Sequence, residues 1–122
     1  MKFTVIILFA LLLIVGSCEK EGEQQLNKVC FTRTNTHLKI NNGTEQQIYF
    51  AAFGQDILPV INWVPLCIEE KGISAKSSAS LELSSISTYA ERRLVVYWWQ
   101  CGGNTPGQLK NVTLTKNETE CR

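Results

Sequence analysis

Residues 92–100 read RRLVVYWWQ, and every position from Leu94 to Trp99 is apolar or aromatic. A half-buried strand alternates apolar and polar side chains, whereas a strand covered on both faces is apolar throughout. Val, Tyr and Trp are also residue types that favour extended backbone. This stretch therefore predicts a central β-strand, around which the rest of the fold is arranged.

The segments on either side of this strand have the same texture. Short stretches rich in Val, Ile, Thr, Tyr and Phe are separated by turn residues, and none keeps a helical i, i+3, i+4 apolar spacing for three turns. Besides 92–100, the strands expected from this pattern are 29–34, 37–41, 45–53, 78–83 and 108–115. About seven short strands predict an all-β fold, an antiparallel β-sandwich of immunoglobulin-like architecture.

Two hairpins are expected within this fold. Residues 37–53 contain Asn42-Gly43, the dipeptide that best supplies the positive φ angles of a type I′ turn, and are predicted to form one hairpin. Strands 92–100 and 108–115 are predicted to form the other, around a loop at Gly102–Gly107.

Two connecting segments have less regular sequences. Residues 57–68 are apolar but contain Pro59 and Pro65, and proline cannot donate to a sheet ladder, so we expect an edge strand or two short strands with a corner. Residues 84–91 can hold a single helical turn but are too few for a helix that is stable alone.

The N-terminus has the features of a secretory signal peptide. Lys2 is followed by an apolar run from Phe3 to Val15, which would span only about 20 Å as a helix and is too short to cross a membrane core of about 30 Å. The run ends in small residues before a cysteine, in the sequence VGSC at 15–18.

This Val15-Gly16-Ser17-Cys18 sequence resembles the lipobox of bacterial lipoproteins, in which the cysteine is acylated and becomes the first residue of the mature chain. The resemblance implies that residues 1–17 are a signal peptide and that Cys18 carries the lipid. Residues 18–27 would then be a flexible polar tether and residues 28–122 a single β-sandwich domain.

The resemblance also bears on localisation. It implies attachment to the cell envelope, at the periplasmic face or the cell surface of the outer membrane. Glu19, Glu21 and Glu23 follow Cys18, and this acidic cluster resembles the export signal that sends some Gram-negative lipoproteins to the cell surface.

The cysteine count agrees with a lipidated Cys18. Five cysteines leave one unpaired, but without Cys18 the remaining four, Cys30, Cys67, Cys101 and Cys121, form an even set typical of two disulfides in an exported domain. Cys101 and Cys121 would lie at opposite ends of the hairpin predicted for residues 92–115, too far apart to be bridged. Two pairings remain open, and we favour Cys67–Cys101 with Cys30–Cys121.

A secreted eukaryotic glycoprotein domain is the alternative. Val15 and Ser17 also suit the common signal peptidase, and N-x-[ST] sequons occur at Asn42, Asn111 and Asn117.

The composition excludes a nucleic-acid-binding protein and provides little for catalysis. Without Lys2 the chain has 12 − 1 = 11 basic residues against 11 acidic ones, so it has no basic field. His37 is the one histidine and is interpreted as an exposed strand residue. The sequence has no nucleophile motif, phosphate-binding loop or metal-ligand spacing. We expect no enzymatic activity, no metal and no cofactor.

The candidate binding residues are aromatic. In strand 92–100 Val95, Tyr97 and Trp99 share one face, and a two-layer sandwich buries only one face of each sheet. The outer face is therefore either covered by the 84–91 connection or the tether, or exposed as a binding patch of Tyr97 and Trp99 with Trp63.

The sequence thus predicts a lipid-anchored envelope module that binds a glycan or an envelope protein, with lipid on Cys18 as its contact with the membrane. The alternative function is an inhibitor or immunity-type lipoprotein that blocks a hydrolase through the 102–107 loop.

Overall fold

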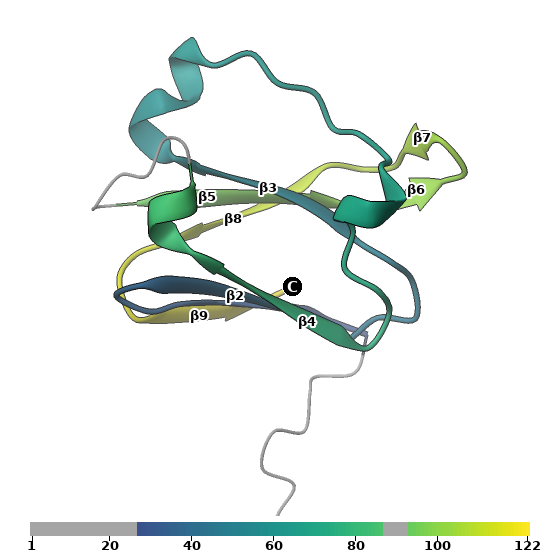
Figure 1. Ribbon diagram of the computed structural model, residues 1–122, viewed down its shortest axis with the longest axis horizontal. Helices are drawn as coiled ribbons and strands as arrows, with labels where there is room; N and C mark the ends of the chain where they lie inside the picture. Colours follow the sequence, from purple (N-terminus) through teal and green to yellow (C-terminus); the bar gives the residue numbers. More distant parts are fainter. Residues whose placement is uncertain (1–26, 87–92) are drawn as a thin grey trace, which may run out of the picture.

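The computed structural model describes residues 27–86 and 93–122, whose two larger sheets are antiparallel and lie one above the other (Figure 1). The four-stranded sheet has the order β4 (Ser77–Glu82), β2 (His37–Asn42), β1 (Val29–Arg33) and β9 (Glu118–Cys121). The three-stranded sheet has the order β3 (Tyr49–Gly54), β5 (Leu94–Trp99) and β8 (Lys110–Leu114). The fold is all-β, as the sequence predicts.

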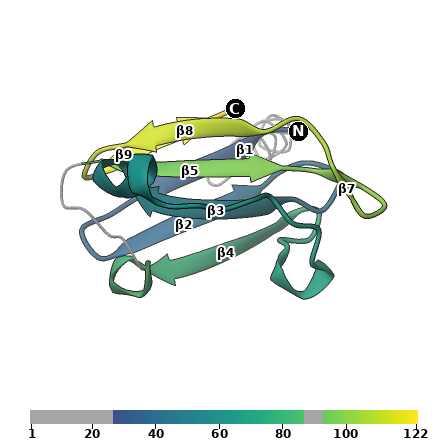
Figure 2. The same ribbon diagram turned by 90° about the horizontal axis from the view of Figure 1, so that it is seen from above.

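Alternate side chains of both sheets fill the space between them. On β5, Leu94, Val96 and Trp98 face the four-stranded sheet, and the rings of Trp98 and Phe31 lie 6.1 Å apart between centroids. Figure 2 shows the strands of the three-stranded sheet crossing those of the four-stranded sheet at an angle. The buried core consists of Val29, Phe31, Leu38, Ile40, Ile48, Ile73, Leu83, Ile86, Leu94, Val96, Trp98, Val112 and Leu114.

The stretch LVVYWW is the central strand of its sheet, which confirms the prediction. β5 pairs with β3 on one side and with β8 on the other, and the predicted β5–β8 hairpin is present. The loop at its tip is itself a small hairpin of β6 (Cys101–Gly102) and β7 (Thr105–Pro106). Gly103 takes a φ of 63° at the turn, where a side chain would be strained.

The hairpin predicted for residues 37–53 is wrong. β2 pairs with β1 and β4, whereas β3 belongs to the opposite sheet and pairs with β5. Neither Asn42 nor Gly43 is among the positive-φ residues of the described chain, so the type I′ turn is absent there. The segment between β2 and β3 instead carries the chain from one sheet to the other.

The physical reason is the side chain of Asn42, which is completely buried. Its Nδ2 donates to the carbonyl oxygens of Gln46, Ile73 and Ser74, at 2.8, 3.0 and 3.1 Å. Its Oδ1 accepts from the backbone N–H and the hydroxyl of Thr44. The amide therefore stabilises a crossover that no local turn rule predicts.

The strand predicted within residues 57–68 is also wrong. The chain forms a 3-10 helix, η2 (Gln55–Val60), continues without a ladder partner from 61 to 68, and forms a second 3-10 helix, η3 (Glu69–Lys71). Pro59 lies inside η2 and Pro65 inside the extended part, and neither supplies the N–H that a sheet requires.

A C-terminal strand was not predicted. β9 pairs with β1, and the register sets Cys30 opposite Cys121 with their Cα atoms 4.0 Å apart. These two residues form one disulfide, and Cys67 and Cys101 form the other. Both pairings are those that the sequence favours.

The 78–83 prediction is confirmed by β4, whose Ala79 and Leu81 pack against the core. η4 (Leu83–Ser85) supplies the short helical turn expected after it. The predicted signal peptide, Cys18, the predicted tether up to residue 26 and residues 87–92 lie outside the described residues. Within the described part of the chain, no helix combines the length and apolar character needed to cross a membrane.

Candidate functional site

The outer face of the three-stranded sheet is covered by residues 55–68, which we call the strap. The strap runs above β3 in Figure 1. The ring of Trp63 on the strap lies 5.2 Å from Phe53, 4.9 Å from Tyr97 and 6.1 Å from Trp99, measured between centroids. Trp63 thereby shields the aromatic residues of β3 and β5 from solvent.

The extended half of the strap is fixed at its far end. The indole Nε1 of Trp99 donates a hydrogen bond of 3.1 Å to the carbonyl oxygen of Leu66. The next residue, Cys67, forms the disulfide with Cys101, with Cα atoms 6.0 Å apart. Because a side-chain hydrogen bond and a covalent link act on adjacent residues, the strap is held against the sheet.

The strap exposes apolar side chains to solvent. From 61 to 67 the half-buried and exposed residues alternate, so that Trp63 points to the sheet while Val64 and Leu66 point outward. The exposed fractions are 65% for Val64, 52% for Leu66 and 77% for Val60 at the end of η2. These three residues, which we call the strap ridge, are three of the four large apolar side chains that the described residues expose.

A cavity of about 210 Å³ lies between the strap and the sheet. We call it the strap groove. Nine of its ten lining residues are apolar or aromatic, and one is charged: Tyr49, Phe50, Ala51, Phe53, Trp63, Val64, Leu66, Ile68, Trp99 and Lys71.

The structure brings together the three aromatic residues that the sequence singled out. Trp63, Tyr97 and Trp99 form one cluster, but Trp99 is only 4% exposed and the other two are half-buried. Among the described residues the strap supplies the cover, whereas the tether up to residue 26 and most of the 84–91 connection lie outside them. The ridge and the groove were missed, because residues 61–68 read INWVPLCI and show no alternation of polar and apolar types that would mark an exposed face.

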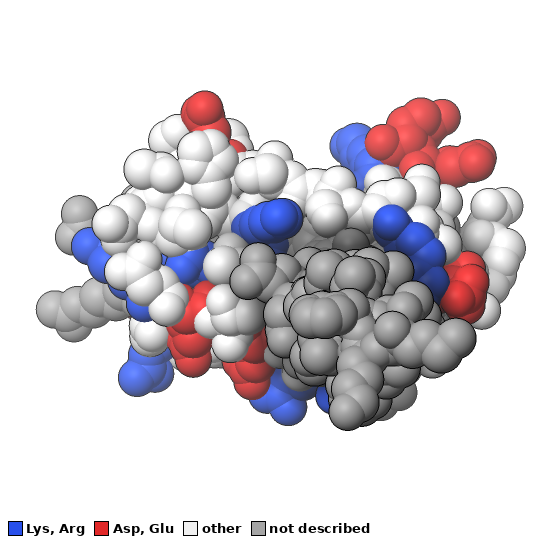
Figure 3. Space-filling model, turned by 90° about the horizontal axis from the view of Figure 1, so that it is seen from below, with Lys and Arg blue, Asp and Glu red and all other residues white. Residues whose placement is uncertain are grey.

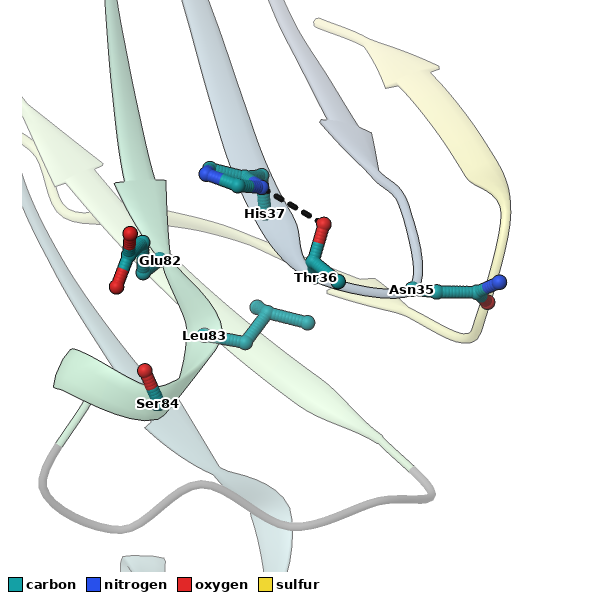
Figure 4. A pocket seen from close by; sticks show the side chains of 6 residues that line it. All are labelled: Asn35, Thr36, His37, Glu82, Leu83 and Ser84. Atoms are coloured by element: carbon teal, nitrogen blue, oxygen red, sulfur yellow. Dashed lines mark hydrogen bonds between the residues drawn. The ribbon is translucent and has the colours of Figure 1, made fainter.

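A second, open cavity of about 420 Å³ surrounds His37. Figure 4 shows His37 and Glu82 projecting beside each other from neighbouring strands, where they are register partners. The cavity is lined by Asn35, Thr36, His37, Glu82, Leu83 and Ser84. His37 is half-buried, so it is less exposed than the sequence led us to expect.

The hydrogen bonds around His37 do not connect a nucleophile to a base. The Nδ1 of His37 lies 2.8 Å from the hydroxyl of Thr36. Within the described chain, neither Ser84 nor Glu82 forms a hydrogen bond or ion pair with the imidazole ring. A general base acts on a proton within hydrogen-bond reach, and this arrangement offers only the neighbouring threonine.

The third feature is the β6–β7 hairpin, which contains most of the 102–107 loop. It projects beyond one end of the sheets in Figure 2, and residues 102–105 are exposed. The Cys67–Cys101 disulfide joins its base to the strap.

The charged side chains of the described residues are visible on one face of the molecule in Figure 3. On the face seen in Figure 3, basic and acidic residues are interspersed. In residues 27–86 and 93–122, no group of three or more His, Cys, Asp or Glu side chains is arranged to hold a metal ion.

Comparison of the chain with protein-family models, with curated proteins and with solved structures finds no match. The functional assignment therefore depends on the geometry of the strap and its surroundings.

Proposed function

We propose that this protein is an exported, lipid-anchored binding module that contacts an envelope protein through the strap ridge and the strap groove. The observation that carries the proposal is an apolar ridge, 52 to 77% exposed, on a segment held by a hydrogen bond and a disulfide. Exposed apolar residues grouped beside a groove are typical of interaction sites.

The fixed strap favours binding for an energetic reason. Association must offset the entropy lost when interface side chains and loops become ordered. The strap is already ordered by Trp63, Trp99 and the Cys67–Cys101 disulfide, so little of this cost remains. The groove beside the ridge provides the concave contact in which interface hot spots concentrate.

The cysteine pairing supports the lipid anchor. Four of the five cysteines are joined in Cys30–Cys121 and Cys67–Cys101, which leaves Cys18 as the one sulfur available for acylation. We place the protein in the cell envelope, anchored to the outer membrane, with no catalytic role.

We also infer that the two sheets form an immunoglobulin-like sandwich. The three-stranded order β3-β5-β8 and the adjacency of β1, β2 and β4 in the other sheet support this assignment. The added β9 beside β1 is a departure from the usual strand order.

The anchor is tested by labelling cells with radioactive palmitate. We expect label on the wild-type protein and none on the Cys18→Ala variant, with the wild type alone in the membrane fraction. If the Cys18→Ala variant were still labelled, or if the wild type were not, the lipid anchor would be contradicted. Neither result would bear on the binding surface at the strap.

The binding surface is tested by site-specific photo-crosslinking in cells that produce the protein. A photoreactive residue at Val64 should give one discrete adduct, which mass spectrometry identifies, and Leu66→Asp in the same chain should abolish it. The same photoreactive residue at Leu109, which is 41% exposed and outside the strap, is the matched control. Equal adducts from positions 64 and 109, or an adduct that survives Leu66→Asp, would refute the proposal.

The β6–β7 hairpin supports a second candidate, inhibition of a hydrolase by insertion of the 102–107 loop. Its exposed residues and its disulfide link to Cys67 favour a rigid, projecting loop. Shortening the hairpin by deletion of Gly103 and Asn104 should abolish inhibition and leave the Val64 adduct intact.

The eukaryotic glycoprotein alternative is weakened at one sequon. Asn42 is completely buried with its Nδ2 in three hydrogen bonds, so a glycan there is incompatible with the fold. Asn111 and Asn117 are exposed.

A further inference from the structure

The volume of the strap groove limits what it can hold. An apolar cavity of about 150 Å³ holds one benzene ring, and sites for drug-sized ligands begin at about 300 Å³. At about 210 Å³ the groove fits one ring-sized group and little more. This is the size expected for a single anchoring side chain of a partner protein.

The walls of the groove favour an aromatic anchor. Tyr49 and Trp99 stack with centroids 6.3 Å apart and planes inclined by 18°, and Trp63 lies opposite on the strap. Aromatic rings pack against one another in offset or tilted arrangements that add to the gain from burial. A phenyl ring in the groove would be surrounded by such partners.

Lys71 adds a charge requirement. It is exposed, lies at the end of η3 and is the one charged residue that lines the groove. Within the described residues, no carboxylate forms an ion pair with its ammonium group. A partner that seats an apolar side chain here therefore gains from a carboxylate next to that side chain.

We infer that the strap groove receives one aromatic side chain of a partner protein, flanked by an acidic residue that pairs with Lys71. The inference rests on the proposed binding function and specifies the chemistry of the partner. The strap ridge favours a protein over a free amphiphile, because apolar surface continues past the groove: Val60 is 77% exposed and is not among the lining residues. Val64 and Leu66 line the groove but are still 65% and 52% exposed, so a ligand confined to about 210 Å³ would leave Val60 in water.

The test uses residues 19–122, which contain the buried core and both disulfides, so neither lipid nor detergent competes for the groove. The probes are acetylated dipeptide amides: Asp-Phe, its neutral analogue Asn-Phe, and Asp-Ala, which lacks the ring. Octanoate represents a free amphiphile. Binding is followed by tryptophan fluorescence and by the indole N–H resonances of Trp63 and Trp99, which line the groove.

Asp-Phe should bind with a dissociation constant on the order of 1 mM, as expected for a ligand of this size. Asn-Phe should bind about two- to fivefold more weakly, the effect of an exposed ion pair. Asp-Ala should bind at least about tenfold more weakly than Asp-Phe, because it has no aromatic ring to bury. In Lys71→Met the preference for Asp-Phe over Asn-Phe should vanish, whereas Lys39→Met, at an exposed position on the other sheet, should keep it.

Three results would overturn the inference: no saturable binding of Asp-Phe, equal binding of Asp-Ala, or an Asp-Phe preference that survives Lys71→Met. Tighter binding of octanoate than of Asp-Phe would assign the groove to a free amphiphile and equally refute it. A Val64 adduct in cells together with any of these results would leave the binding function standing and remove only the aromatic and acidic anchor.

Discussion

Trp99 and Leu66 are joined by a hydrogen bond of 3.1 Å from the indole Nε1 to the backbone carbonyl oxygen. This bond attaches the strap to the central strand of the three-stranded sheet. Trp98, the residue before Trp99 on β5, is equally buried. The Nε1 of Trp98, however, has no hydrogen-bond partner within the described residues. The two adjacent tryptophans therefore offer a matched comparison.

We predict that Trp99→Phe destabilises the protein by about 1 kcal/mol more than Trp98→Phe, because only the first substitution removes a hydrogen bond. Trp99→Phe should also speed hydrogen exchange in residues 61–68, and Trp98→Phe should not. Chemical denaturation and exchange mass spectrometry measure both effects. Equal exchange in the strap of both variants would show that the bond does not hold it.

The disulfides should contribute unequally to stability. Cys30–Cys121 closes 91 residues and Cys67–Cys101 closes 34, so the chain-entropy model gives losses of about 5 and about 4 kcal/mol on removal. The two double variants, each with both cysteines of one disulfide replaced by serine, are compared by urea unfolding, which shows which disulfide contributes more to stability. Removal of Cys67–Cys101 should in addition release the strap and weaken crosslinking from Val64.

Asn42→Ala should destabilise the protein by about 2 to 4 kcal/mol. The substitution removes the three hydrogen bonds that Nδ2 donates and the two that Oδ1 accepts, and it leaves a void where the buried amide was. Asn41→Ala is the control.

Asn41 precedes Asn42 in β2 and lies on the outer face, where it accepts one hydrogen bond from Ser78. Its loss should cost less than about 0.5 kcal/mol. Similar losses at positions 41 and 42 in thermal unfolding would contradict the role given to Asn42.

Glu118 should make the turn between β8 and β9 sensitive to acid. The backbone N–H and the hydroxyl of Thr115 donate to its carboxylate at 2.7 and 2.9 Å, and these bonds lower the pKa of Glu118 below its ordinary value of 4.5. A lowered pKa in the folded state means that the stabilisation is present above pH 4.5 and is lost as the pH falls through the folded pKa.

The stability difference between wild type and Glu118→Gln is therefore expected to be largest at neutral pH and to shrink as the pH falls below 4.5. Unfolding curves collected at intervals across this range measure it. A difference that is constant with pH would exclude the carboxylate as its source.

Much of this fold follows from local sequence patterns. The run from Leu94 to Trp99 predicts a central strand because a stretch that is apolar on both faces is stable only when both are covered. The parity of the cysteines and the reach of the β5–β8 hairpin argued against Cys101–Cys121 and left two pairings open, of which the favoured one is present. These inferences depend on the size and polarity of side chains near one another in the chain, which the sequence states directly.

The errors came from partners distant in the chain. Asn42-Gly43 has the local signature of a tight turn, but carbonyl oxygens of residues 73 and 74 bind the Asn42 amide and direct the chain to the other sheet. β9 was missed because four residues of Glu, Thr and Cys form a strand only where β1 offers an open edge. Local propensity is weaker than such tertiary contacts.

By itself, the sequence determined that the chain is all-β, that LVVYWW is its central strand, and that Trp63, Tyr97 and Trp99 are the aromatic residues to consider. Only the tertiary structure decided that Trp63 covers the other two, and that the surface left for a partner is the ridge of Val60, Val64 and Leu66 with the groove beside it. The reason is that strand identity depends on the side chains of a segment, whereas exposure depends on which other segment lies above them.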